Sequence, residues 1–355
     1  MKIAVYAISK NEEQFVKRFC ESAKDADLIL IADTGSTDNT VSEAIKYGAI
    51  PFNIAVKPWR FDKARDTALN LIPADYDVCI SLDLDEVLED GWRAEIERVW
   101  KADTTRLRYK FDWGQGICFF YEKIHHRHGY HWHHPVHEYP RPDGRITEVY
   151  AHTDKLLVSH YPDNSKSRGQ YMPLLELAVK EDPHCPRNAF YHARELTFYN
   201  RWLDAVVALN KYLAMPEANW INERCYAMRL LGKAYDALHQ DGRDWFRKAC
   251  KEAPNTREPW VELAQSCYAK AEWQEVYDSC KQALTIKNKE AVYTMNPEVW
   301  GALPHDLLAI SAYNLQKYEE AIEHGELAVQ LDPDNTRLKA NLDYYRAKNG
   351  MANAN

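Results

Sequence analysis

The chain has 355 residues, of which 46% are hydrophobic and 28% are charged, and its formal net charge is −8. This length exceeds one ordinary core and predicts two domains, with the composition of a soluble globular protein. The negative charge disfavours non-specific binding to nucleic acid, and no apolar run approaches the roughly 20 residues that a membrane-spanning helix needs.

The eight cysteines are scattered along the chain without a C-x-x-C pair. This spacing favours free thiols in a reducing compartment over a disulfide framework or a zinc site. Residues 1–5 lead directly into a strand and lack the pattern of a cleavable signal peptide. We therefore expect a cytoplasmic protein with no membrane partner.

Short apolar runs alternate with amphipathic segments through the first half of the chain. We predict strands over residues 2–8, 28–32, 51–56 and 78–82. We predict helices between them, over residues 11–24, from 37 or 38 to 48, and over 63–71. Alternation at this spacing indicates βαβ units and a mostly parallel, Rossmann-like sheet.

From residue 173 onward the pattern is helical, and four segments repeat the same order of residue types. Each has a small residue, then an aromatic or turn residue, then a second amphipathic helix. The small residues are Ala193, Gly232, Ala264 and Ala309. Their spacings of 39, 32 and 45 straddle the roughly 34-residue period of helical hairpins. The segment resembles the tetratricopeptide repeat family, most clearly at residues 260–264 and 321–333, with a generic helical bundle as the alternative. Residues 286–304 look like an insertion.

The polar, turn-rich stretch at residues 162–169 is the expected junction between the two halves. We therefore predict an α/β domain over residues 1–165 and an all-α helical-hairpin domain over residues 173–349. Residues 350–355 should form a frayed tail.

A cluster of carboxylates, Asp83, Asp85 and Glu86, closes the apolar run at residues 78–82. Ligand crevices of open α/β sheets lie at the carboxyl ends of strands. Along a strand successive side chains alternate faces, so Asp83 and Asp85 point the same way and Leu84 points back into the protein. Two adjacent like charges raise each other's pKa unless a cation offsets them, and a divalent ion bound to a diphosphate would do so. An acidic, solvated turn is the alternative.

Polar residues also follow the first two predicted strands, at residues 9–13 and 33–40. Gly35 permits a tight turn there, and the helix that follows offers free backbone N–H groups. A simple capped helix start is the alternative.

Four segments, at residues 9–13, 33–40, 61–66 and 82–88, together resemble in order and spacing the family 2 glycosyltransferases of the GT-A fold. The resemblance covers roughly the first 95 residues. With the helical repeats, the chain resembles bacterial and phage members of this family that carry a tetratricopeptide tail. It implies a nucleotide-diphospho-sugar donor, most often a UDP-sugar.

The resemblance also implies roles for individual donor-binding residues. Asp33 would hydrogen-bond the nucleobase, usually uracil. The main chain near Ala7 and the side chains of Asn11 and Glu12 would line the base and ribose pocket. Arg65 would contact the base or the diphosphate, although Asp66 stands where the family usually has asparagine.

The metal and the general base follow from the same resemblance. Asp85 would hold Mn²⁺ or Mg²⁺, Asp83 would face ribose or support the metal, and His160 matches the late histidine that completes the metal shell. Glu138 lies in an H-E element and is the candidate base for an inverting displacement, with Asp112 in reserve. The acceptor is left open between protein, peptide, glycan and modified nucleic acid, although the negative charge of the chain argues against the last.

Nine of the fourteen histidines fall between His125 and His160. They could form a second metal site, although their spacing fits no standard zinc pattern, or they could serve as polar and stacking residues. Trp113, Tyr130 and Trp132 could stack on a sugar or fill the core.

Two other functions compete with a transferase. The chain could be an inactive scaffold whose repeats bind a protein partner or mediate self-association, because concave repeat surfaces suit extended segments. It could also be a nucleotidyltransferase, but such enzymes usually carry a glycine-rich loop after the first strand, and residues 9–12 contain no glycine.

Overall fold

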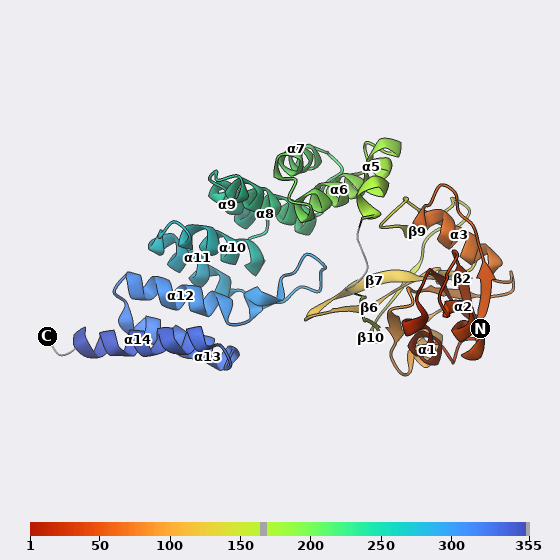
Figure 1. Cartoon of the computed structure of the whole chain (residues 1–355), viewed down its shortest axis with the longest axis horizontal. Coiled ribbons are helices and arrows are strands. Elements are labelled where there is room, and N and C mark those ends of the chain that lie inside the picture. The colour runs from red at the N-terminus through yellow and green to blue at the C-terminus, as the bar shows by residue number, and fades with distance from the viewer. Residues whose placement is uncertain (164–168, 353–355) are drawn as a thin grey trace. The chain divides into compact units, whose positions relative to one another are not determined.

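The computed structural model describes residues 1–163 and 169–352 and divides into two compact units, Met1–Glu181 and Asp182–Asn355 (Figure 1). The predicted junction lies partly at residues 164–168, outside the described residues. The division itself comes after helix α5 (Tyr171–Glu181), which therefore belongs to the first unit rather than to the repeats.

The first unit is built on one mixed sheet. Its strands, in the described residues, are β1 (Ile3–Ser9), β2 (Leu28–Asp33), β3 (Ile50–Asn53), β4 (Val78–Ser81), β5 (Glu86–Leu88), β6 (Arg106–Gly114), β7 (Ile117–His126) and β10 (Tyr150–His160), in the order β3-β2-β1-β4-β7-β6-β10-β5. β8 (Tyr130–His133) and β9 (Tyr139–Pro142) form a separate two-stranded ribbon. The first four strands pair in parallel, as predicted, and β7 then joins β4 antiparallel.

Helices cover both faces of this sheet, and β1 is therefore buried on both sides. The helices are α1 (Glu13–Ser22), α2 (Thr40–Lys46), α3 (Phe61–Leu71) and α4 (Trp92–Val99). Ile3 and Val5 belong to the core cluster that contains α1 and α4, whereas Ala4 and Tyr6 pack in the cluster that contains α3. This two-residue alternation is that of a strand, and it confirms the predicted α/β architecture.

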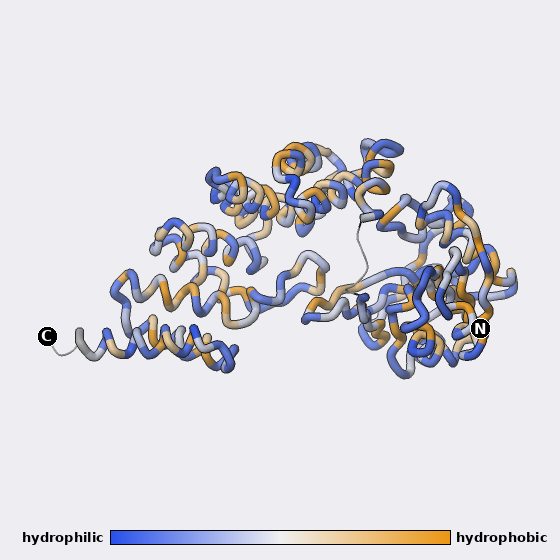
Figure 2. The backbone as a smooth tube through the Cα atoms, viewed as in Figure 1, coloured by the Kyte–Doolittle hydropathy of each residue, from blue (hydrophilic) through white to orange (hydrophobic). Residues whose placement is uncertain are grey.

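The second unit is an array of helical hairpins followed by one more helix. The helices are α6 (Pro186–Phe198), α7 (Trp202–Leu213), α8 (Ile221–Ala237), α9 (Arg243–Glu252), α10 (Arg257–Tyr268), α11 (Trp273–Thr285), α12 (Leu303–Asn314), α13 (Tyr318–Leu331) and α14 (Thr336–Ala352). Hydrophobic and hydrophilic residues alternate along them (Figure 2). Gly232 shows why a small residue is required: a Cβ there would lie 2.6 Å from the ring of Phe246 on α9.

The predicted insertion and tail have specific structures. Residues 286–296 are an irregular segment that ends in the 3₁₀ helix η1 (Pro297–Trp300), and Arg229 on α8 donates to the backbone oxygen of Thr294 at 3.1 Å. The predicted tail is in part helical, because α14 continues to Ala352. Its last residues, 353–355, lie outside the described residues.

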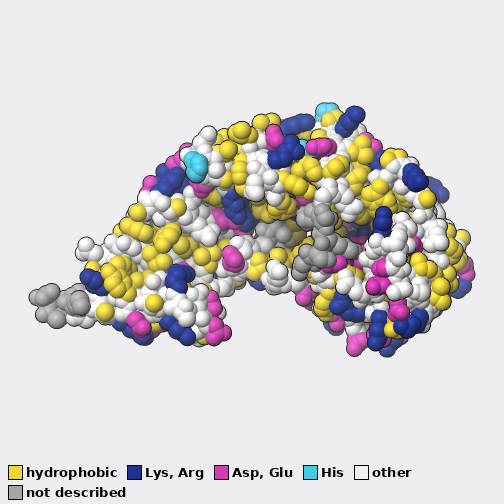
Figure 3. Space-filling view, viewed as in Figure 1, with side chains coloured by type: hydrophobic (Ala, Val, Ile, Leu, Met, Phe, Trp, Pro, Cys, Tyr) yellow, Lys and Arg dark blue, Asp and Glu magenta, His cyan; other side chains and the backbone are white. Residues whose placement is uncertain are grey.

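All eight cysteines are free thiols. Within the described part of the chain, no helix is both long enough and apolar enough to cross a bilayer. Charged side chains of both signs are scattered over the visible face of each unit (Figure 3).

Candidate functional site

The loops that follow β1 and β2 are joined at the carboxyl edge of the sheet. Asp33 ends β2 opposite Ser9 and is almost completely buried. Its carboxylate accepts hydrogen bonds from the Ser9 hydroxyl (3.0 Å), the Gly35 amide (3.0 Å) and both the amide and hydroxyl of Ser36 (2.9 and 2.5 Å). Burial opposes ionisation, but these donors hold the pKa of Asp33 below its usual value. Asp33 is thus an ionised anchor of this loop.

The other predicted base-pocket residues lie beside this anchor. Asn11 has a left-handed backbone (φ 55°), and its side-chain oxygen accepts a hydrogen bond from the Thr37 amide at 2.8 Å. The Glu12 amide donates to the Thr40 hydroxyl at 2.7 Å. Ala7 lies within β1 and its side chain is fully buried, so it packs in the core two residues before the carboxyl end of the strand.

Arg65, on α3, is the centre of a buried charge network. Its side chain is 3% exposed. It forms ion pairs with Asp83 (Nη2 to Oδ1, 2.5 Å) and, through Nε, with Glu138, and Nη1 donates to the Ser81 hydroxyl at 3.1 Å. The guanidinium also lies 5.0 Å from the ring centre of Trp132. Three predicted site residues are therefore in direct contact.

The strand does not continue through the carboxylates, so the prediction that Asp83 and Asp85 share one face was wrong. β4 ends at Ser81, and the chain turns, closed by a hydrogen bond from the Glu86 amide to the Asp83 backbone oxygen at 2.9 Å. Asp83 pairs with Arg65, whereas Asp85 pairs with His160. The turn thus separates the two aspartates into different environments.

A second buried cation, Lys123 on β7, was missed by the sequence reasoning. Its Nζ lies 3.4 Å from Asp83 Oδ2 and 3.2 Å from Glu86 Oε1. Burial alone would lower the pKa of Lys123, but the two carboxylates raise it well above its ordinary value. Although partial burial opposes ionisation, Arg65 and Lys123 likewise hold the pKa of Asp83 below its usual range. Asp83 is thus an anion held between two cations.

Glu86 completes this network. It is 3% exposed, and its Oε2 accepts a hydrogen bond from the Asp83 amide at 3.0 Å. Burial raises the pKa of Glu86, which Lys123 opposes and Asp83 reinforces.

Asp85 and His160 form a separate pair at the end of the sheet. Antiparallel pairing of β5 with β10 sets His160 opposite Glu86, and His160 Nε2 lies 3.3 Å from Asp85 Oδ2. Burial lowers the pKa of His160, but Asp85 more than offsets this and the pKa is raised. The His160 ring packs against Trp113, with the centroids 4.4 Å apart.

This pair fits a divalent cation. Two ligand atoms that each lie about 2.1 Å from one ion, at roughly right angles, are about 3 Å apart, close to the observed separation. A carboxylate and an imidazole suit Mn²⁺. The three predicted ligands do not converge, however: among the described residues, the one trio of metal-type side chains with ligand atoms within 4.8 Å is Cys267, Glu272 and Glu275. Asp83 is held by its two cations instead.

The loop that carries Glu138 is tightly built. His134 and His137 have left-handed backbones (φ 80° and 52°), a conformation that non-glycine residues adopt infrequently and often near functional sites. The Phe61 amide at the start of α3 donates to the Pro135 backbone oxygen at 3.0 Å. The Glu138 side chain, 8% exposed, is therefore fixed against α3 by both the loop and Arg65.

The ring of Trp132 beneath Arg65 is itself fixed by a buried network. Trp132 Nε1 donates to the Tyr6 hydroxyl (2.8 Å), which contacts His125 Nε2 at 3.0 Å. Burial lowers the pKa of His125 to about 3, so the ring is neutral. Asp66, the departure from the family pattern, accepts a hydrogen bond from the Trp132 amide at 2.6 Å and thereby anchors β8 to α3.

The remaining histidines of the rich segment do not assemble a metal centre among the described residues. His133 packs against His134, with ring centroids 4.1 Å apart, and both rings lie near Tyr139. Tyr130 is 6% exposed and donates to Glu148 at 3.1 Å. These rings serve packing and hydrogen bonding.

Asp112, the reserve base, lies on β6, where it accepts a hydrogen bond from the Gly114 amide at 2.9 Å in the turn to β7. Its neighbour Trp113 is 48% exposed. Asp112 therefore contacts the β6–β7 turn.

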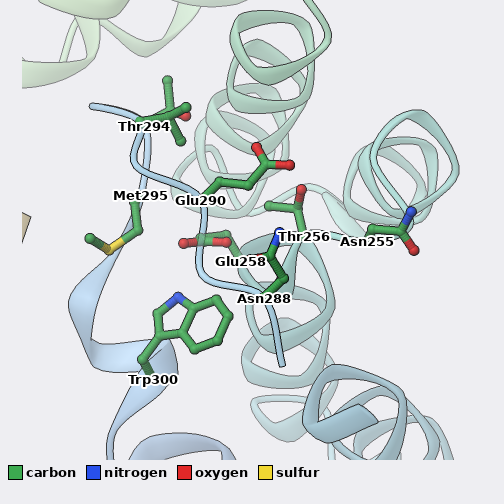
Figure 4. A pocket seen from close by; sticks show the side chains of 9 residues that line it. Asn255, Thr256, Glu258, Asn288, Glu290, Thr294, Met295 and Trp300 are labelled. Atoms are coloured by element: carbon green, nitrogen blue, oxygen red, sulfur yellow. The ribbon is translucent and has the colours of Figure 1, made fainter. Parts of the chain in front are cut away.

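The second unit contains a small pocket where the insertion meets the start of α10 (Figure 4). Its lining residues are Asn255, Thr256, Glu258, Asn288, Glu290, Val292, Thr294, Met295 and Trp300. The buried Glu258 is already bound by the Asn296 amide at 3.0 Å. None of the predicted site residues lines this pocket.

Two family models match the chain. Residues 5–144 match glycosyl transferase family 2, and residues 302–335 match the tetratricopeptide repeat. Residues 5–144 are therefore similar to a family 2 glycosyl transferase domain, and residues 302–335 are similar to a tetratricopeptide repeat. The region from Ala7 to Glu138 that holds the network lies within the first match.

Curated relatives are similar to part of this chain. An uncharacterized glycosyltransferase of Rickettsia conorii is 34% identical over 103 residues, which cover 28% of this chain and 35% of the relative. An uncharacterized glycosyltransferase of Rickettsia bellii is 33% identical over 109 residues, which cover 30% of this chain and 35% of the relative. The chain thus spans about a third of the length of these relatives.

Solved structures resemble the helical half at low identity. The TPR protein YrrB, described as having an unusual peptide-binding site, aligns with 50% of this chain and 84% of its own at 14% identity and a TM-score of 0.40. The MamA protein aligns with 48% of this chain and 85% of its own at 16% identity and a TM-score of 0.39.

Proposed function

We propose, from the premise that residues 5–144 are similar to a family 2 glycosyl transferase domain, that this chain transfers a sugar from a nucleotide-diphospho-sugar to a hydroxyl or other nucleophile of an acceptor. The preferred donor is a UDP-sugar. One observation carries the proposal: Arg65 joins Asp83, from the acidic turn after β4, to Glu138, from the late H-E element. Motifs far apart in sequence thus meet at one edge of the sheet.

The donor would bind across the loops at the carboxyl ends of β1, β2 and β4. Asp33 would reach the nucleobase by exchanging one of its loop hydrogen bonds, and Asn11 and Glu12 would line the base and ribose. Asp83 keeps 41% of its side chain exposed while its oxygens are held by cations. A fixed carboxylate with an open side can accept hydrogen bonds from ribose hydroxyls.

Asp85 and His160 would hold Mn²⁺ or Mg²⁺. The ion, when bound, neutralises charge on the departing nucleoside diphosphate. Arg65 and Lys123 are already paired with their own carboxylates, so the charge of the donor diphosphate would be offset chiefly by this ion.

Glu138 would act as the base in a single inverting displacement. Its Oε1 is held by Arg65, so its second oxygen is the atom that would take the acceptor proton. The acceptor then attacks the anomeric carbon from the side opposite the leaving diphosphate, and the proton passes to Glu138 as the glycosidic bond forms. Asp112 is the alternative base.

The helical hairpins would bind a protein partner, position the acceptor protein, peptide or glycan, or mediate self-association. The tetratricopeptide match at residues 302–335 supports this role, because stacked hairpins offer an extended surface. Eight free thiols favour a reducing compartment, the cytoplasm.

Hydrolysis of a panel of nucleotide sugars, with Mn²⁺ and with Mn²⁺ removed by chelation, tests this function. We expect one donor class to be cleaved with Mn²⁺, and Asp85→Ala to lower the rate by about two orders of magnitude or more. If no donor is cleaved and Asp85→Ala leaves UDP binding unchanged, the transferase function is wrong and an inactive repeat scaffold is the better description.

A further inference from the structure

The acidic turn offers a divalent cation two aspartates one residue apart, yet the structure treats them differently. Asp83 has one carboxylate oxygen on Arg65 and the other on Lys123, and both cations are buried, with 3% and 6% of their side chains exposed. Asp85 is 23% exposed. Among the described residues, Asp85 forms an ion pair with His160 and with no lysine or arginine.

We propose that Lys123 is a positioning residue that keeps Asp83 out of the metal shell and so assigns the divalent cation to Asp85. This inference rests on the proposed function and deepens it. Lys123 contacts Asp83 and Glu86 and would act through Asp83, so its effect is on which carboxylate is available as a metal ligand.

Electrostatics carries the first step. An ion bound to Asp83 would have to displace Lys123 or sit within a few ångströms of two buried positive charges. Because such charges are poorly screened, the repulsion is much larger than in water. Asp85 presents the opposite situation, since the side chain 3.3 Å from its carboxylate is His160, a residue type that itself ligates metal ions. The ion therefore favours Asp85.

The second argument is that Glu86 holds Lys123 in position beside Asp83. Glu86, itself 3% exposed, binds Lys123 at 3.2 Å and also accepts the hydrogen bond of the Asp83 amide. The lysine thus has a dedicated counter-ion and stays in place whether or not Asp83 changes partner. A buried ion pair is often no more stabilising than well-packed apolar residues, so the Lys123–Glu86 pair is better explained by the charge that it places beside Asp83 than by the stability of the fold.

Mn²⁺ binding to the full chain, measured from the paramagnetic resonance signal of free Mn²⁺ with UDP present, tests the proposal. In the wild-type background we expect Asp85→Asn to weaken Mn²⁺ binding about tenfold or more, and Asp83→Asn to weaken it less than about threefold. In the Lys123→Met background, Asp85→Asn should weaken binding less than about threefold, because Asp83 has lost one cation and can take the ion. Lys123→Arg should restore the wild-type pattern.

The matched control is Lys110→Met on the neighbouring strand β6, for which Asp85→Asn should keep its full effect. If Lys123→Met does not fold, Lys123→Gln combined with Glu86→Gln removes both charges of the pair and leaves Asp83 with Arg65 alone. The proposal is overturned if Asp85→Asn has the same effect with and without Lys123, or if Asp83→Asn is the more damaging change in the wild-type background.

Turnover of the donor panel, measured on the same samples, separates the two ideas. If the effect of Asp85→Asn on Mn²⁺ binding depends on Lys123 (coupling) but no donor is turned over, the role of Lys123 is supported and the transferase function is contradicted. Turnover without coupling would leave the transferase function intact and overturn the role of Lys123. A wild-type chain that binds no Mn²⁺ with UDP would overturn the assignment of the ion to Asp85.

Discussion

Arg65 donates a hydrogen bond through Nε to the carboxylate of Glu138, which lies 73 residues further along the chain. The same guanidinium binds Asp83 at 2.5 Å, so the candidate base and a candidate donor-binding residue share one buried cation. Arg65 is in turn fixed by the Ser81 hydroxyl at 3.1 Å. Arg65 thus links the two carboxylates directly, in addition to the loop contact that holds Glu138 and the Lys123 contact that holds Asp83.

Glu138→Gln tests the base directly. The amide oxygen can still accept the hydrogen bond from Arg65, but an amide cannot take the acceptor proton. We expect sugar transfer to fall by about 10²- to 10⁴-fold, with UDP binding unchanged. Glu122→Gln, a half-exposed glutamate on β7, is the control and should remain active. A Glu138→Gln enzyme that keeps most of its activity would move the base role to Asp112, and Asp112→Asn would then be the inactive variant.

Arg65→Met tests the network as a structural unit. It leaves Glu138 and Asp83 without their shared cation, and removing one partner of a buried pair destabilises a fold by about 3–5 kcal/mol. We expect the lower end, because Asp83 keeps 41% of its side chain exposed. Urea dependence of amide exchange in β4 measures the loss. Arg98→Met, which removes an exposed arginine paired with Glu95, should leave this protection unchanged; equal behaviour of the two variants would argue against the network.

The sequence was sufficient to find the residues around Arg65 but not how they divide their roles. Resemblance to a family placed Asp83, Arg65 and Glu138 at one site, and the structure brings them into contact. Side-chain alternation along the predicted strand put Asp83 and Asp85 on one face, because that strand was extended past its end at Ser81. A strand end depends on where its neighbours stop pairing, and the pattern of apolar residues does not encode that.

Lys123 was missed for a related reason. It follows Glu122 on β7, and two charged residues in succession read as a solvent-facing stretch of strand. Burial of Lys123 becomes visible only from the sheet order, because β7 pairs antiparallel with β4 and carries the lysine to the acidic turn. Pairing between strands so distant in sequence is a tertiary property. One feature of the sequence could have indicated Lys123: Glu86 in the acidic motif had no assigned role, and a buried carboxylate there needs a cation as partner.

His160→Ala tests the metal pair independently of the base. Loss of the imidazole leaves Asp85 as the remaining ligand of the pair, and we expect the Mn²⁺ concentration for half-maximal turnover to rise about 10- to 100-fold. Excess Mn²⁺ should then recover activity, which loss of a catalytic base would not permit. His152→Ala, on the same strand β10, is the control. A His160→Ala enzyme with an unchanged Mn²⁺ requirement would show that this histidine only packs against Trp113.

The buried ring of His125 should make the stability of the first unit depend on pH. Its pKa is about 3 in the folded chain, because the ring is buried against the Tyr6 hydroxyl, and about 6.5 when unfolded. Above pH 6.5 the ring is neutral in both states and has no effect on stability. As the pH falls from 6.5 toward 3, only the unfolded chain takes up the proton, so unfolding becomes easier by about 1.4 kcal/mol per pH unit.

Urea unfolding of the first unit between pH 7.5 and pH 4, followed by amide exchange in β1 and β7, measures this slope. His125→Gln removes the titrating ring while keeping a group that can hydrogen-bond to Tyr6, so it should flatten the dependence even if the variant is less stable at pH 7.5. His184→Gln, which changes an exposed histidine, should leave the slope as it is. If His125→Gln leaves the slope of stability against pH unchanged, groups other than His125 cause the acid sensitivity, and the prediction is wrong.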